Sequence, residues 1–157
     1  LAMLDLSKLE SEKVSLDLGP LDLLDIVDET LESMIYLFEK KDVHLITELE
    51  SAPIMADDFK MRMVVNNFIS NALRYTDTGK DVTIHLDEHT FFVENEGQHI
   101  SEEELEKIWI TFYKVDKARN EEGTGLGLAI CKAILELHHF EYGVKNTEKG
   151  VLFYVKY

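Results

Sequence analysis

Three glycines at alternate positions, followed at once by an apolar helical run, are the residues of this sequence that most clearly suggest chemistry. They are Gly123, Gly125 and Gly127, and the run continues from Leu128 to Cys131. Glycine lets backbone N–H groups approach a ligand without a Cβ in the way. A helix that starts there adds unpaired N–H groups and the positive end of its dipole. The pattern predicts a phosphate cradle; the alternative is a flexible turn before a structural helix.

This glycine run differs from two familiar phosphate-binding motifs. A P-loop needs Lys-Ser or Lys-Thr after its last glycine, and no such pair follows here. A Rossmann fingerprint has its third glycine one residue later and directly after a strand, whereas residues 114–122 are polar and charged. The glycines therefore lie between a polar segment and a helix, which is typical of a lid and its hinge.

Two asparagines four residues apart, Asn67 and Asn71, place two carboxamides on one face of a predicted helix. Carboxamide oxygen is a hard, neutral ligand that suits Mg²⁺ already bound to phosphate and water. Arg74 lies on the same stripe and could contact phosphate. The alternative is an exposed polar stripe, or hydrogen bonding between the helix and a loop, with no ligand.

A predicted strand ends in polar side chains followed by glycine, in the segment Val93–Gly97. A side chain at this point could read the exocyclic amine of adenine, and Gly97 would let the base approach. A simple strand-to-helix turn is the alternative. The apolar and aromatic segment Ile108–Lys114 is interpreted as core, with Phe112 as a candidate anchor for the lid.

The length and charge of the chain restrict its class. Its 157 residues fit one domain with a real core. The formal net charge of −15 argues against a nucleic-acid partner, whereas a nucleotide screened by Mg²⁺ remains compatible. The single cysteine, Cys131, lies in an apolar run and is expected in the core. No apolar run reaches roughly 18 residues, so no direct membrane contact is predicted, and a start at Leu1 without methionine suggests a fragment of a longer protein.

Hydrophobic periodicity and turn residues predict the order of the elements. Helices are expected over residues 1–12, from Gly19-Pro20 to about Lys41, from a cap at Asp57 or Asp58 to about Tyr75, from a Ser101–Glu104 capping box to Ile108 or Trp109, and from the glycines to about His138. Strands are expected over Val14–Leu18, Val43–Leu49, Ala52–Ala56, Asp81–Asp87, Phe91–Glu94, Phe140–Lys145 and Val151–Tyr157. A doubly wound parallel sheet would alternate strictly, so the order predicts an α/β (α+β) fold: a two-layer α/β sandwich with one mixed sheet and helices on one face.

Four segments, in order and suitably spaced, resemble the motifs of the catalytic ATP-binding domain of two-component sensor histidine kinases. Residues 67–76 (NFISNALRYT) are similar to its N box, 95–100 (NEGQHI) to its first glycine box, Phe112-Tyr113 to its F box and 123–127 to its second glycine box. Each motif is weak alone, but the ordered set is specific and covers nearly the whole chain. Residues 4–10 (LDLSKLE) resemble the end of the dimerisation helix hairpin, which predicts that hairpin over 1–12 and the catalytic domain over 13–157.

The resemblance implies the Bergerat ATP-binding fold, with ATP under a lid at roughly 114–122 and Mg²⁺ at the N box. It implies that Asn71 is the preferred candidate for the Mg²⁺ ligand, with support from Asn67, that Arg74 contacts phosphate, and that these three residues carry catalysis. It also implies that Asn95 faces the adenine amine. The other nucleotide contacts that it implies are Tyr75, Gly97, Ile100, Phe112, Lys114, Gly123, Thr124, Gly125, Leu126, Gly127 and Leu128.

Three features depart from the family pattern. Asn95 replaces the aspartate of the first glycine box, and His99 replaces its second glycine. The asparagine oxygen still accepts a hydrogen bond, but the bond loses charge assistance, a difference of about 1 kcal/mol. Weakened ATP binding is therefore expected. Asn67 stands where hydrolysing relatives carry a glutamate that activates water, and an amide is a poor base, which favours phosphoryl transfer over hydrolysis. None of the six histidines lies in a phosphoacceptor motif, so all six are interpreted as structural or surface residues.

These observations predict a domain that transfers the γ-phosphate of Mg·ATP to a histidine on its own dimerisation domain, in a homodimer, for relay to a response regulator. The parent protein is expected to be a membrane-anchored bacterial protein with this part in the cytoplasm. Two alternatives stay open. One is a nucleotide-binding regulatory module without kinase activity, which the Asn95 and His99 departures motivate, and the other is an ATPase or serine kinase of the same fold.

Overall fold

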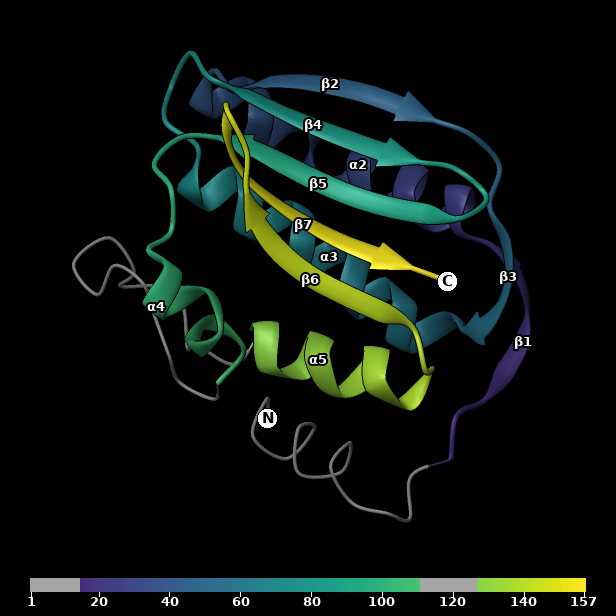
Figure 1. Ribbon diagram of the computed structural model, residues 1–157. Helices are drawn as coiled ribbons and strands as arrows, with labels where there is room; N and C mark the ends of the chain where they lie inside the picture. Colours follow the sequence, from purple (N-terminus) through teal and green to yellow (C-terminus); the bar gives the residue numbers. More distant parts are fainter. Residues whose placement is uncertain (1–14, 111–126) are drawn as a thin grey trace.

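A mixed five-stranded sheet forms one layer of the computed structural model, which describes residues 15–110 and 127–157 (Figure 1). The strand order is β2-β4-β5-β7-β6, in which β2 and β4 are parallel and the other neighbours are antiparallel. Strands β1 and β3 form a separate antiparallel ribbon. The strands are β1 (Leu18–Asp22), β2 (His44–Leu49), β3 (Pro53–Asp57), β4 (Asp81–Leu86), β5 (Thr90–Glu96), β6 (Glu141–Asn146) and β7 (Gly150–Lys156).

Three helices cover one face of this sheet: α2 (Leu23–Lys41), α3 (Asp58–Tyr75) and α5 (Gly127–Leu137) (Figure 1). The core lies between the two layers, where Phe68 of α3 packs against Phe91 and Phe153, with ring centroids 6.1 and 5.7 Å apart. Burying a side chain of this size contributes roughly 1.5–3 kcal/mol. The predicted two-layer sandwich with a mixed sheet and helices on one face is therefore confirmed.

The start of α3 follows the prediction closely, because Asp57 is its N-cap. The Asp57 carboxylate accepts hydrogen bonds from the backbone N–H groups of Lys60, at 3.1 Å, and Asp17, at 3.0 Å. Burial alone would raise the pKa of Asp57, but these bonds and the Lys60 ammonium hold it below its ordinary value. The Asp57 N–H donates to Nε2 of His138, whose Nδ1 lies 2.8 Å from the carbonyl oxygen of Ile134. A carbonyl can only accept, so Nδ1 of His138 donates while its Nε2 accepts from Asp57, and His138 is a structural residue, as predicted.

The first strand differs from its prediction. A strand was expected over Val14–Leu18, with a helix starting at Gly19-Pro20, whereas Leu18–Asp22 is the strand. The helix begins later because Asp22 caps it by accepting a hydrogen bond from the N–H of Leu24, at 3.0 Å. Pro20 is tolerated because β1 has a single neighbour in its ribbon and so does not need every N–H.

The prediction of one continuous helix starting from a capping box at Ser101 is also wrong. Only α4 (Glu102–Leu105) is α-helical, and a 3₁₀ turn, η1 (Lys107–Trp109), follows it. The Ser101 hydroxyl donates to the Glu104 carboxylate, at 3.3 Å, instead of accepting from the backbone, so no capping box forms. The other elements agree with prediction to within a few residues. The helix expected over residues 1–12 lies outside the described residues.

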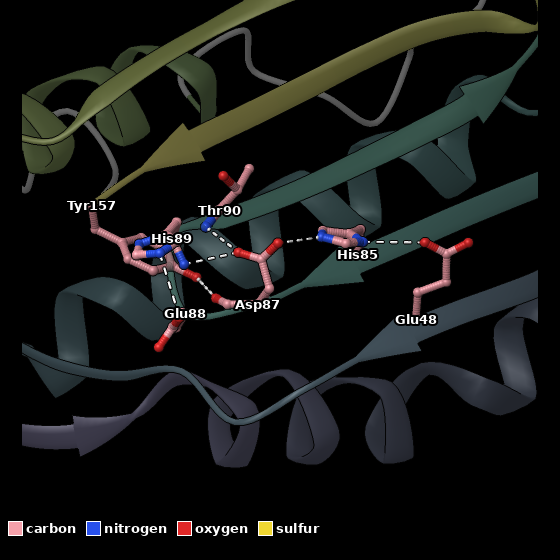
Figure 2. A network of polar contacts seen from close by, with 7 residues as sticks. All are labelled: Glu48, His85, Asp87, Glu88, His89, Thr90 and Tyr157. Carbon is pink, nitrogen blue, oxygen red and sulfur yellow. Dashed lines mark hydrogen bonds and ion pairs between the residues drawn. The ribbon is translucent and has the colours of Figure 1, made fainter.

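A polar network fixes the β4–β5 turn, at the end of the sheet where β5 begins (Figure 2). His85 bridges two strands, with Nε2 2.8 Å from the Asp87 carboxylate and Nδ1 3.1 Å from that of Glu48. Asp87 also accepts hydrogen bonds from the N–H groups of His89 and Thr90, both at 2.8 Å. Its bonds to His85 and to the backbone lower the pKa of Asp87 to about 2. This network stabilises the sheet, as expected for structural histidines.

Within 15–110 and 127–157, no helix is long and apolar enough to cross a membrane. Cys131 is fully buried in α5, which confirms its assignment to the core. Burial raises the pKa of its thiol, so the group is not a nucleophile.

Candidate functional site

The end of α3, the end of β5 and the start of α5 converge on one side of the molecule, the left side of Figure 1. A Cβ on Gly97, just after β5, would lie 3.5 Å from the carbonyl oxygen of Tyr75, the last residue of α3. A Cβ on Gly127, the first residue of α5, would lie 2.6 Å from Oδ1 of Asn67. Segments that are 22 and 60 positions apart in the sequence thus meet, and with them most of the predicted site residues that the structure describes.

Asn95 is the most unusual polar side chain of this region. It is 5% exposed, and in the alternation of β5 it points to the helical layer, as do Phe91 and Val93. Among the described residues, none forms a hydrogen bond with its carboxamide. A buried amide normally has a partner, and leaving one without costs about 1–3 kcal/mol. Gly97 leaves space beside it, since a Cβ there would lie 3.8 Å from Asn95 Nδ2. The carboxamide of Asn95 thus offers a donor and an acceptor to a flat polar ligand, and Gly97 leaves room for it.

The two predicted metal ligands have different surroundings. The Nδ2 of Asn67 donates to the carbonyl oxygen of Met63, at 2.8 Å, and its Oδ1 lies beside Gly127, where a Cβ would clash with it. Asn71, one turn later, is half-buried, and no described residue forms a hydrogen bond with its side chain. Its oxygen is a suitable ligand for a hard cation that keeps phosphate and water in its shell. The described ranges contain no cluster of three or more His, Cys, Asp or Glu side chains that could bind a metal.

The end of α3 carries the predicted phosphate and pocket residues. Arg74 is exposed in its last turn, and Tyr75 is half-buried. Lys41, at the end of α2, donates to the carbonyl oxygens of Leu73, at 2.7 Å, and Arg74, at 3.1 Å, and so fixes this terminus. Reasoning from the sequence missed this role of Lys41, because no local pattern links it to carbonyl groups more than 30 positions away.

Some predicted nucleotide contacts cannot be placed. Phe112, Lys114, Gly123, Thr124, Gly125 and Leu126 lie outside the described residues. Ile100 and Leu128 are half-buried and pack against the core. Gly127 opens an 11-residue helix whose first N–H groups and dipole favour an anion at this point. The described part of the site therefore has the features of a cradle for a negatively charged ligand.

The loop after β5 is hydrogen-bonded to the turn between β6 and β7, a contact that no sequence pattern predicted. The N–H of Gly97 donates to the carbonyl oxygen of Lys149, at 3.1 Å, and His99 and Ile100 contact the same turn. His99, the residue that departs from the family pattern, thus lies in a structural contact.

The fold is a two-layer α/β sandwich in which α3, β5 and α5 bring a set of polar groups together at one side. Residues 56–157 match the sequence model of a family described as histidine kinase-, DNA gyrase B-, and HSP90-like ATPase, and the chain belongs to this family. It is a catalytic ATP-binding domain of the sensor histidine kinase type, which confirms the resemblance seen in its motifs.

Similar proteins agree with this assignment. The chain is 35% identical over 161 residues to the probable sensor kinase SilS of Salmonella typhimurium, with 98% of this chain and 32% of the relative covered. The catalytic domain of histidine kinase ThkA has a TM-score of 0.79 at 26% identity, over 90% of this chain and 95% of that one. ShkA, solved in complex with AMPPNP, shares the fold with a TM-score of 0.82 at 22% identity, over 99% of this chain and 34% of that one. The chain spans about a third of the length of curated relatives such as SilS.

Proposed function

We propose that this domain binds Mg·ATP and presents the γ-phosphate to a histidine on the dimerisation domain of its parent protein. The observation that carries the proposal is the buried carboxamide of Asn95, which has no partner within the described residues and lies beside the space left by Gly97. Adenine offers an exocyclic amine next to a ring nitrogen, and the oxygen and nitrogen of one carboxamide can bind both. Satisfying this amide would remove the cost of its burial.

The phosphates would lie between Asn71, Arg74 and the start of α5. Arg74 and the first N–H groups of α5 supply positive charge, and Asn71 would hold Mg²⁺ through its carboxamide oxygen. When bound, Mg²⁺ would neutralise charge on the β- and γ-phosphates. Phosphoryl transfer requires little more than positioning and charge neutralisation, so these groups suffice without a strong base in the domain.

The surroundings of Asn67 favour transfer over hydrolysis. Its amide is a poor base, and its oxygen faces Gly127, so it is badly suited to activate water. Asn67 supports the metal site by its place beside Asn71. Steady release of phosphate from ATP by the purified chain, abolished by Asn71→Ala, would instead support an ATPase.

The partners follow from the same assignment. We propose that residues 1–12 end a dimerisation helix hairpin, that the parent protein is a homodimer, and that a response regulator receives the phosphoryl group. The relatives are named sensor kinases, which supports a cytoplasmic position for this domain in a membrane-anchored protein.

A calorimetric titration with a non-hydrolysable ATP analogue tests the nucleotide site. Asn95→Ala should weaken binding about tenfold both with and without Mg²⁺, because it removes contacts to the base. Asn71→Ala should weaken binding chiefly when Mg²⁺ is present. Asn66→Ala is a matched control, since Asn66 is an exposed neighbour on the same helix. A folded chain that shows no binding at millimolar analogue would contradict the proposal.

Transfer is tested separately from binding. The domain is mixed with γ-labelled ATP and the separately produced dimerisation domain of its parent, and acid-labile label on histidine is measured. Binding without any labelled histidine would favour the regulatory module over the kinase.

A further inference from the structure

We infer that the β6–β7 turn, residues 146–150, positions the adenine-reading loop, residues 95–100, and that Asn146 is a positioning residue for nucleotide binding. This inference rests on the proposed function. The turn and the loop are about 50 positions apart in the sequence, but they contact each other through several polar groups. We call this set of contacts the turn–loop clamp.

Asn146 makes two hydrogen bonds of the clamp, both to the backbone of Ile100. Its Oδ1 accepts a hydrogen bond from the N–H of Ile100, at 3.0 Å, and its Nδ2 donates to the carbonyl oxygen of the same residue, at 2.7 Å. One carboxamide thus satisfies both backbone groups of Ile100, as a neighbouring strand would. A side chain bound at two points holds a loop in one orientation better than a single bond would.

Two further bonds hold the middle of the loop. The N–H of Gly97 donates to the carbonyl oxygen of Lys149, at 3.1 Å, and His99 Nε2 lies 2.6 Å from the carbonyl oxygen of Thr147. The carbonyl can only accept, so Nε2 of His99 carries the hydrogen. His99 therefore supplies an additional attachment at a position where the family pattern has glycine.

The turn itself is braced and can therefore act as a fixed support. The N–H of Thr147 donates to the carbonyl oxygen of Gly150, at 2.8 Å, and the N–H of Gly150 donates to the hydroxyl of Thr147, at 3.1 Å. Gly150 also lies against the backbone of Asn95, since a Cβ there would be 2.0 Å from the Asn95 carbonyl oxygen. The clamp thus reaches the residue proposed to read the base, and its loss should loosen base recognition in particular.

The test is a competition titration in the 157-residue chain that gives the Kd of ATP and the Kd of GTP. In Asn146→Ala, ATP binding should weaken about tenfold, and the ratio of the two Kd values should move toward one, because the loop no longer holds the base-reading groups in place. A smaller folded fraction alone would weaken both nucleotides equally and leave the ratio unchanged. The ratio therefore separates a positioning role from a merely structural one.

Two companion variants keep the test decisive. His99→Ala lies in an exposed loop and should fold normally, with about a threefold loss of ATP affinity and a smaller change of the ratio. Lys145→Ala, an exposed neighbour on β6, should match the unsubstituted chain. An unchanged ratio in both Asn146→Ala and His99→Ala would overturn the clamp while leaving the proposed function intact. Absence of ATP binding by the unsubstituted chain would overturn both.

Discussion

Gly150 occupies a position where even a methyl group has no room. A Cβ at this residue would lie 2.0 Å from the carbonyl oxygen of Asn95 and 2.7 Å from the amide nitrogen of Gly97. The restriction is steric and not conformational, because among the described glycines only Gly79 has a positive φ. Gly150→Ala must therefore push apart β7 and the end of β5.

The expected cost is large because both obstacles are backbone atoms. Overpacking that a side chain can relieve costs about 1–3 kcal/mol, and here the sheet itself must shift, so we expect a loss of about 3 kcal/mol or more. With a urea m-value of about 2 kcal/mol/M, the unfolding midpoint should fall by about 1.5 M. The displaced Asn95 should also weaken ATP binding in the molecules that stay folded.

Gly143→Ala is the matched control in the same sheet. A Cβ there would lie 2.5 Å from the hydroxyl of Tyr154 and 2.7 Å from the adjoining ring carbon. Tyr154 is half-exposed, so its ring can turn aside, and the cost should be about 1 kcal/mol or less. Urea unfolding followed by circular dichroism compares the two variants. Equal midpoints for Gly150→Ala and the unsubstituted chain would refute the steric reasoning.

Three further predictions concern the rest of the fold. Burial lowers the pKa of His85, but its hydrogen bonds to Asp87 and Glu48 raise it more, so the folded state holds this proton more tightly than the unfolded state. The stabilisation is fully present below the unfolded pKa of 6.5 and is lost as the pH rises through the folded pKa. Between pH 6 and pH 8.5, the free energy of unfolding measured in urea should therefore fall more in the unsubstituted chain than in His85→Gln. Cys131, fully buried, should react with a thiol reagent about a hundredfold more slowly in buffer than in urea, and equal rates would contradict its burial. Asp57→Ala should cost about 2 kcal/mol in urea unfolding, because it removes a helix cap and further bonds; a loss below about 0.5 kcal/mol would show that the cap is dispensable.

Local patterns predicted those parts of the fold that local physics controls. The span and cap of α3 follow from an aspartate before an apolar stripe at helical spacing, and both were confirmed. The same kind of reasoning failed at Pro20, where the pairing of β1 with β3 outweighed the tendency of proline to start a helix. It failed again at Ser101, whose hydroxyl pairs with a carboxylate instead of the backbone.

In the candidate site, too, local patterns predicted some features and long-range contacts decided the others. The sequence alone supplied the chemical groups: Asn67 and Asn71 on one helical face, Asn95 before a glycine, and glycines before a helix. Each of these signals spans a few residues, so spacing is enough to find it. The prediction that the ligand is ATP came from the resemblance of these ordered motifs to a known family.

Only the tertiary structure decided which of these groups remain available to a ligand. It places the carboxamide oxygen of Asn67 beside Gly127, buries Asn95 with no hydrogen-bond partner among the described residues, and bonds Ile100 to Asn146, 46 positions along the chain. Such contacts depend on the order of strands in the sheet and on the layer of helices above it. A hydrogen bond between distant segments leaves no periodic trace in the sequence, because its geometry exists only after the chain has folded.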